Sequence, residues 1–161
     1  MSPSEPYFRD MRLSDLRQVM AIERASFPTP WSHFAFIHEI YQNRNAEYVV
    51  AVVDGHIAGY SGMWVMAGEA HITNLAVDPD LRRQGLGTAL LEEMVRRARH
   101  MGCTHITLEV RKSNEPAQAL YRKLGFSAEG VRPGYYSDTA EDAIIMTRRE
   151  SFSEERVGRD G

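Results

Sequence analysis

Residues 82–88 combine two glycines with basic and polar side chains in a spacing that suits phosphate binding: Arg82-Arg83-Gln84-Gly85-Leu86-Gly87-Thr88. An apolar, β-prone run from Ile72 to Val77 precedes this stretch, and a long amphipathic helical pattern follows it. At the start of a helix the first backbone N–H groups lack intrahelical acceptors and the helix dipole is positive, so anions bind there. Gly85 and Gly87 lack the Cβ atoms that would keep phosphate oxygens away. We therefore predict a pyrophosphate-binding loop; the alternative is a loop that only begins the helix.

Two common phosphate-binding motifs do not fit this loop. A P-loop requires a lysine between its last glycine and the following Ser or Thr, but Thr88 follows Gly87 directly. The dinucleotide fingerprint requires Gly or Ala three residues after its second glycine, and Leu90 occupies that position. The pattern that remains is R/Q-x-x-G-x-G, beginning at Arg82.

Glu109 is the first side chain that could act in catalysis. It lies in an alternating segment whose apolar residues take one face of a strand, while Glu109 and Thr107 take the other. Both faces of this strand are expected to be covered. A partly desolvated carboxylate there would have a raised pKa and could serve as a general base. The alternative is an ion pair with Arg111 or another basic neighbour, and spacing alone does not separate the two.

Tyr121 is the second such side chain. It shares one face of a predicted helix with Ala117, Leu120 and Leu124, so periodicity alone favours a core aromatic residue. Its phenol could also donate a proton to a leaving group. Asn114 lies at the start of the same helix, where the simplest interpretation is an N-cap.

The chain has 161 residues, a formal net charge of −3, one cysteine and six histidines. This length predicts one domain, which we place at residues 7–148, with flexible tails at 1–6 and 150–161. The charge argues against a general nucleic-acid binder, the single cysteine excludes an internal disulfide, and no H-E-x-x-H spacing occurs. There is neither a leader-like N-terminus nor an apolar run of the roughly 20 residues that span a bilayer. We expect a cytoplasmic protein with no metal, nucleic-acid or membrane partner.

Hydrophobic periodicity and turn residues predict elements in the order β-α-α-β-β-β-α-β-α-β-β. We expect strands near 7–12, 47–53, 56–66, 70–77, 104–110, 126–132 and 143–148, and helices near 14–26, from 32, 86–101 and 115–124. Ser14 and Ser32 are the expected N-caps, and Trp31 and Phe36 have the spacing of a hydrophobic staple. This order predicts an α/β (α+β) fold, a mixed sheet with helices on both faces.

Several blocks of the chain resemble a known family. The R/Q-x-x-G-x-G loop, between a strand and a helix, resembles the acetyl-CoA signature of the GNAT acetyltransferase superfamily. The segment 108–126, with Leu-Glu-Val-Arg-x-Ser-Asn at its start, resembles the second signature of the RimI-type ribosomal-protein-alanine N-acetyltransferases. The same family is matched by blocks at 27–32, 74–79 and 135–146. The blocks occur in the family's order, and the resemblance extends from about Tyr7 to Arg148.

The resemblance implies an acetyl-CoA-dependent N-terminal acetyltransferase, with an alanine-starting ribosomal protein as the expected acceptor. It implies direct attack by the amine, with Glu109 as the base and Tyr121 as the acid. For the cofactor, the resemblance implies that loop 82–88 holds the pyrophosphate and that Asn114 makes a further contact with the cofactor. The backbone that would hold the pantetheine and the acetyl oxygen is that of Leu75, Ala76 and Val77.

The peptide acceptor would lie against Trp31 and the pair Tyr135-Tyr136 under the same comparison. The alternatives are core packing for the tryptophan and a plain hairpin tip for the tyrosines. Residues 132–135 and 137–140 depart from the family pattern, and both segments lie in the hairpin on the expected substrate side.

Two other functions stay open at this point. The same fold and acetyl donor could serve a lysine side chain or a small amine, which an acceptor assay would separate. A CoA-binding regulatory module without activity is the other, and the presence of both Glu109 and Tyr121 argues against it.

Overall fold

The computed structural model describes residues 5–150, which divide into two compact units. Unit 1 comprises the described residues up to Trp64 together with Thr73–Met94, and unit 2 comprises Val65–Ile72 and the described residues from Val95 onward. Strand β4 (Glu69–Val77) and helix α3 (Leu86–His100) run through both units. Of the two expected tails, residues 1–4 and 151–161 lie outside the described residues, and a single domain over 7–148 stays a prediction.

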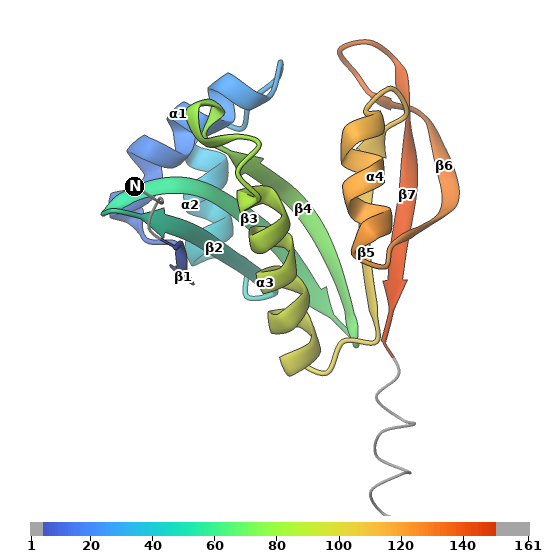
Figure 1. The fold of residues 1–161 in the computed structure, drawn as a ribbon, viewed down its shortest axis with the longest axis horizontal. Coiled ribbons are helices and arrows are strands. Elements are labelled where there is room, and N and C mark those ends of the chain that lie inside the picture. The colour runs from blue at the N-terminus through green and yellow to red at the C-terminus, as the bar shows by residue number, and fades with distance from the viewer. Residues whose placement is uncertain (1–4, 151–161) are drawn as a thin grey trace, which may run out of the picture. The chain divides into compact units, whose positions relative to one another are not determined.

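Unit 1 is built on three antiparallel strands and the second half of β4. Its elements are β1 (Tyr7–Asp10), α1 (Leu16–Ser26), α2 (His33–Tyr41), β2 (Ala46–Val53), β3 (His56–Met66, as far as Trp64) and the short 3-10 turn Pro79–Leu81. In Figure 1, α2 lies behind these strands and α3 crosses in front of them. The apolar faces of α1 and α2 pack on β2 and β3, with Val19, Phe36, Val50 and Tyr60 fully buried.

The start of α2 follows the predicted capping chemistry, whereas the start of α1 does not. Ser32 accepts a hydrogen bond from the Ala35 N–H at 3.1 Å, and the rings of Trp31 and Phe36 lie 5.2 Å apart, which confirms the cap and the staple. Ser14 is not a cap. A 3-10 turn, Leu13–Asp15, precedes α1, and its Asp15 carboxylate accepts the Arg12 N–H at 2.8 Å. Asp15 also binds the Arg9 guanidinium, and Ser14 lies inside the 3-10 turn rather than at the position before α1.

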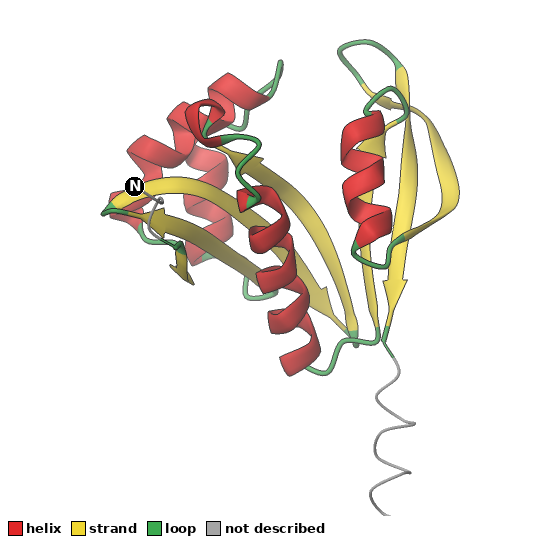
Figure 2. Cartoon of the chain, in the orientation of Figure 1, coloured by secondary structure: helices red, strands yellow, loops and turns green. Residues whose placement is uncertain are grey.

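Unit 2 continues the sheet with strands from four segments. The first half of β4 pairs in parallel with β5 (His105–Arg111), β5 pairs with β7 (Glu141–Arg149), and β7 pairs with β6 (Ser127–Tyr136). Helix α4 (Glu115–Lys123) lies against β5 and β7 (Figure 2). The complete strand order is β1-β2-β3-β4-β5-β7-β6, a seven-stranded mixed sheet. The predicted order of elements and the α/β class are thereby confirmed.

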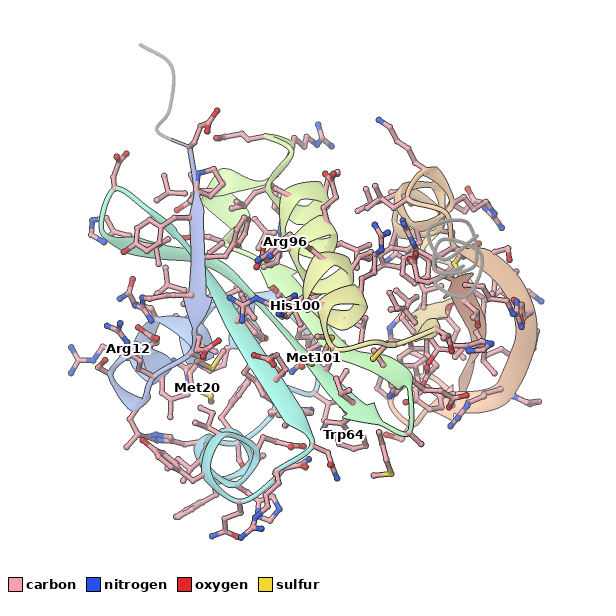
Figure 3. All side chains as sticks on the ribbon, turned by 90° about the horizontal axis from the view of Figure 1, so that it is seen from below. Arg12, Met20, Trp64, Arg96, His100 and Met101 are labelled. Atoms are coloured by element: carbon pink, nitrogen blue, oxygen red, sulfur yellow. The ribbon has the colours of Figure 1, made fainter. Side chains whose placement is uncertain are left out.

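Two boundaries differ from expectation for local reasons. We expected a strand to end near Arg132, but β6 continues to Tyr136 through a register shift that includes Pro133 and Gly134. We also expected the helix that begins at Leu86 to extend to Met101. The helix ends at His100, and Met101 is 44% exposed beside Gly102, whose φ is +82° (Figure 3).

We predict that Gly59→Ala destabilises the fold. A Cβ at Gly59 would lie 2.9 Å from the carbonyl oxygen of Ala76, and backbone cannot move aside as a flexible side chain can. We expect the free energy of unfolding to fall by about 1–3 kcal/mol, as in other overpacked sites. Chemical denaturation measures this.

Gly130→Ala is the matched control. Its added Cβ would meet only the Ile145 Cδ1 at 3.5 Å, an ordinary contact. Its stability should stay within about 0.5 kcal/mol of the wild type. Equal effects of the two substitutions would contradict the close approach of β3 and β4.

Candidate active site

The glycine loop of unit 1 ends in the start of a long helix, as predicted. Arg83 and Gly85 have left-handed backbones, with φ of +66° and +79°, and α3 then begins at Leu86. A Cβ at Gly85 would meet nothing within 4 Å, and one at Gly87 would meet only the Val77 Cγ2 at 3.8 Å. The space in front of the first turn is therefore open to a ligand, and the N–H groups of that turn have no acceptor within the helix. The loop fits an anionic ligand.

The Arg82 side chain stabilises this loop through two hydrogen bonds. Its Nε donates to the Val77 carbonyl at 3.4 Å, and its guanidinium also donates to the Ser26 hydroxyl at 3.1 Å. The side chain thus joins the loop to the end of β4 and the end of α1. Its contribution to a ligand would come from its backbone.

The end of β4 holds a buried donor with no partner among residues 5–150. The Asn74 Oδ1 accepts the Thr73 hydroxyl at 2.8 Å and the Asn74 carbonyl accepts the Ser61 hydroxyl at 2.7 Å, while Nδ2 is unpaired. An unpaired buried donor costs about 1–3 kcal/mol, so it is expected to gain an acceptor when a ligand binds. Asn74 directly precedes Leu75, Ala76 and Val77, the segment expected to hold the pantetheine.

In unit 2, Glu109 is buried and paired with a histidine. Its side chain is 7% exposed, and its carboxylate oxygens lie 2.7 and 3.0 Å from Nε2 of His71, whose side chain is 34% exposed. Burial raises the pKa of Glu109. The hydrogen bond and charge of His71 lower it, with further lowering from Arg132 and from the Tyr135 hydroxyl, and the lowering prevails. The expectation of a raised pKa was wrong, because it counted burial without these partners.

His71 was not predicted as a partner of Glu109. The alternative expectation was an ion pair with Arg111 or another basic neighbour, but Arg111 binds Asp138 and Glu141 instead. The parallel register pairs His71 with Thr107, which shares a strand face with Glu109. The available signal was a histidine in the strand before a β-α-β crossover, whose two strands are expected to be neighbours.

Three tyrosines lie with Glu109 in unit 2. Burial raises the pKa of Tyr121, whose ring lies 6.2 Å from that of Phe126, so its phenol keeps its proton. Burial also raises the pKa of Tyr136 to about 12, helped by the charges of Tyr135, Glu109 and Tyr121 and opposed by Arg111. The structure thus brings together four of the predicted site residues: Glu109, Tyr121, Tyr135 and Tyr136.

Asn114 and Trp31 both make structural contacts: Asn114 those of an N-cap, and Trp31 those of a packed core residue. Asn114 caps α4 by accepting the Ala117 N–H at 3.2 Å. Trp31 packs on Phe36 and Tyr48, with ring centroids at 5.2 and 6.3 Å. Their roles toward the cofactor and the peptide stay predictions.

Metal and membrane features can be assessed only in the described part of the chain. Within residues 5–150, no group of three or more His, Cys, Asp or Glu side chains could hold a metal ion. The helices of the same segment are all too short or too polar to cross a bilayer.

The model of the Acetyltransferase (GNAT) family matches residues 16–126 of this sequence. The chain belongs to the GNAT acetyltransferase family. A Bacillus subtilis (strain 168) protein named "Putative [ribosomal protein bS18]-alanine N-acetyltransferase" is 45% identical over 138 residues, covering 86% of this chain and 91% of that protein. The [Ribosomal protein bS18]-alanine N-acetyltransferase of Escherichia coli (strain K12) is 39% identical over 140 residues, covering 84% and 92%.

Solved structures agree with this assignment. The crystal structure of the ribosomal-protein-S18-alanine N-acetyltransferase from Escherichia coli has a TM-score of 0.84 at 36% identity, covering 91% of this chain and 95% of that chain. Ard1 from Thermoplasma volcanium has a TM-score of 0.81 at 28% identity, covering 92% and 99%. The predicted GNAT fold is confirmed.

This GNAT protein is an acetyl-CoA-dependent N-acetyltransferase. The open helix start, the left-handed Gly85 and the unpaired Asn74 donor all fit a long ligand with a pyrophosphate and amide groups. The loop 82–88 would hold the pyrophosphate through its backbone, and residues 75–77 would hold the pantetheine. Acetyl-CoA supplies the reactive thioester.

We predict that His71→Leu raises the pKa of Glu109. The substitution removes a hydrogen bond and a charge that lower this pKa, while the burial that raises it remains. His71→Gln should raise it less, because an amide still donates a hydrogen bond. Carboxyl-carbon NMR titration of the folded protein measures the change.

His56→Gln, at the exposed first residue of β3, is the control and should leave the Glu109 titration as it is. An unchanged titration in His71→Leu would show that the His71 contact does not keep Glu109 ionised.

Proposed function

We propose that this GNAT acetyltransferase acetylates the α-amine of a protein N-terminus, and that its acceptor is an alanine-starting ribosomal protein. The names of the Bacillus subtilis and Escherichia coli relatives support bS18 as that protein. We also propose that it acts in the cytoplasm, where ribosomal proteins are made, with no nucleic-acid or membrane partner, and that residues 7–148 form its single catalytic domain.

The observation that carries the choice of amine is the depressed pKa of Glu109. A carboxylate whose pKa is lowered is a weak base, so the acidity of the ammonium that it deprotonates matters. An N-terminal ammonium has a pKa of about 8 and a lysine ammonium about 10.4, so proton transfer from the lysine costs about 3 kcal/mol more. An N-terminal amine is also partly neutral at pH 7.5, whereas lysine is almost wholly charged. The basicity of Glu109 therefore favours an N-terminal acceptor.

The proposed proton transfers use groups of unit 2. Glu109, directly or through a water molecule, accepts the proton that the attacking amine loses, and His71 stabilises the ionised carboxylate that awaits it. The Tyr121 phenol, which burial keeps protonated, donates its proton to the departing thiolate of CoA.

Direct attack by the amine is supported by the chain's single cysteine. Cys103 is fully buried, and burial raises the pKa of its thiol, so it is unsuited to form an acyl-enzyme. Trp31, Tyr135 and Tyr136 are the proposed peptide contacts, and Asn114 is a proposed cofactor contact.

A panel of peptides tests the proposal. The protein is incubated with acetyl-CoA and peptides that start with alanine, serine or a bulky residue, and products are located by mass spectrometry. We expect acetylation of free N-termini, with alanine favoured. A peptide with a blocked N-terminus and an internal lysine is the control. Preference for the blocked lysine peptide would overturn the N-terminal assignment, and CoA binding without any turnover would overturn catalysis.

Tyr121→Phe tests whether Tyr121 acts as an acid or only packs in the core, because the substitution keeps the packing volume and removes only the hydroxyl. We expect turnover to fall by roughly 10²–10⁴-fold, the usual contribution of a positioned acid, with acetyl-CoA affinity nearly unchanged. Steady-state kinetics and calorimetry measure the two quantities. Tyr41→Phe, on the exposed side of α2, should be neutral. Near-normal turnover in Tyr121→Phe would assign Tyr121 to packing alone.

A further inference from the structure

The tip of the β6–β7 hairpin is poorly fixed by strand pairing. The register shifts between Arg132 and Tyr136, so the residues between them, Tyr135 included, have no partner in the β6–β7 register. Pro133 lacks an N–H, and Gly134 is left-handed at φ +59°. One side chain compensates locally, since Asp142 Oδ1 accepts the Gly134 N–H at 2.9 Å. Other contacts are needed to hold Tyr135 and Tyr136 in one place.

Arg111, at the end of β5, supplies those contacts for Tyr136, whose ring in turn lies 5.0 Å from that of Tyr135, and Arg132 lies over the Tyr135 ring at 5.5 Å. The Arg111 guanidinium lies over the Tyr136 ring, 4.1 Å from the centroid. It also donates to Asp138 Oδ2 at 2.8 Å and more weakly to Glu141 Oε1 at 3.4 Å and the Thr139 hydroxyl at 3.3 Å. The planar Arg111 guanidinium thus contacts Tyr136 before the turn, Asp138 within it and Glu141 after it.

The same arginine joins the tip to the catalytic strand. Arg111 and Glu109 are two residues apart, so their side chains share one face of β5. The hydroxyl of Tyr135 lies close enough to Glu109 to act on its carboxylate, and Tyr136 lies beneath Arg111. Tyr135 therefore interacts with Glu109, and Tyr136 interacts with Arg111, which lies two residues further along β5. Glu141 extends the connection by accepting the Ser113 N–H at 2.7 Å, just after the strand.

We propose that Arg111 is a positioning residue for the peptide acceptor, which holds Tyr135 and Tyr136 where they receive the N-terminal segment of the substrate. This inference rests on the proposed function, because it takes the two tyrosines as peptide contacts. Arg111 does not touch the reacting atoms. Its loss affects capture of the peptide far more than the chemical step or the binding of acetyl-CoA.

The geometry requires arginine in particular. A flat guanidinium can stack on a ring while its edge donates to two carboxylates, whereas a lysine ammonium offers a point charge with no planar face. Arg111→Lys keeps the charge opposite Asp138 and loses the stacked plane. It therefore gives an intermediate effect, whereas Arg111→Gln loses both.

The experiment compares Arg111→Gln and Arg111→Lys with Arg122→Gln, the same charge loss at an exposed position of α4. Folding is checked by circular dichroism and thermal melting. Arg111→Gln raises the peptide KM by about tenfold or more, as the loss of a charge-assisted contact predicts, with kcat within about threefold and acetyl-CoA Kd unchanged. Arg111→Lys lies between Arg111→Gln and the wild type, and Arg122→Gln matches the wild type. Hydrogen exchange of the amides of residues 134–141 accelerates most in Arg111→Gln, less in Arg111→Lys and not in Arg122→Gln.

The outcomes separate this inference from the proposed function. If the wild type acetylates no peptide N-terminus, the proposed function fails, and the exchange measurement still reports whether Arg111 orders the tip. If the wild type is active but the folded Arg111→Gln variant keeps its peptide KM, or loses kcat alone, the positioning role is wrong. Should Arg111→Gln not fold, a wild-type peptide KM in Arg111→Lys overturns the inference.

Discussion

The site depends on keeping one carboxylate charged where water hardly reaches it. A side chain as buried as Glu109 would take up a proton unless a cation or donor offset the loss of hydration. His71 provides this offset at 2.7 Å, and it can do so only because β4 and β5 pair in parallel with His71 opposite Thr107. The register of two strands thus determines the protonation state of the proposed base. A slip of one residue would turn His71 to the other face.

A second buried carboxylate plays a comparable part in unit 1. Glu23 is 2% exposed and accepts hydrogen bonds from the Tyr60 hydroxyl and, at 2.8 Å, from the Trp31 N–H. It therefore anchors the segment between α1 and α2 to a core strand, just where two prolines prevent helical hydrogen bonding. In both units, a buried acid on a regular element fixes a less regular segment. One fixes the backbone of Trp31, and the other interacts with the hydroxyl of Tyr135.

The sequence was sufficient for features that depend on local chemistry. The cap at Ser32 and the staple of Trp31 and Phe36 involve only neighbouring residues, so their spacing predicted them. Features that depend on distant partners were missed. The pKa of Glu109 depends on His71, 38 positions away, and the turn that precedes α1 is held by the contact of Asp15 with Arg9 of β1. Likewise, Pro133 and Gly134 have no partner in the β6–β7 register, and strand β6 continues past them because Tyr136 pairs with Glu141.

The same reasoning explains why fold and acetyl donor are easier to infer than the acceptor. The proposed donor loop needs only a strand end, a left-handed glycine and a helix start, which are encoded by consecutive residues. The proposed acceptor side consists of β5 and of a hairpin tip whose order comes from side chains such as Arg111 rather than from strand pairing. Substitutions there can change which peptide binds without disturbing the sheet. Selectivity among GNAT acceptors can therefore diverge in such a tip while the acetyl-CoA loop stays the same.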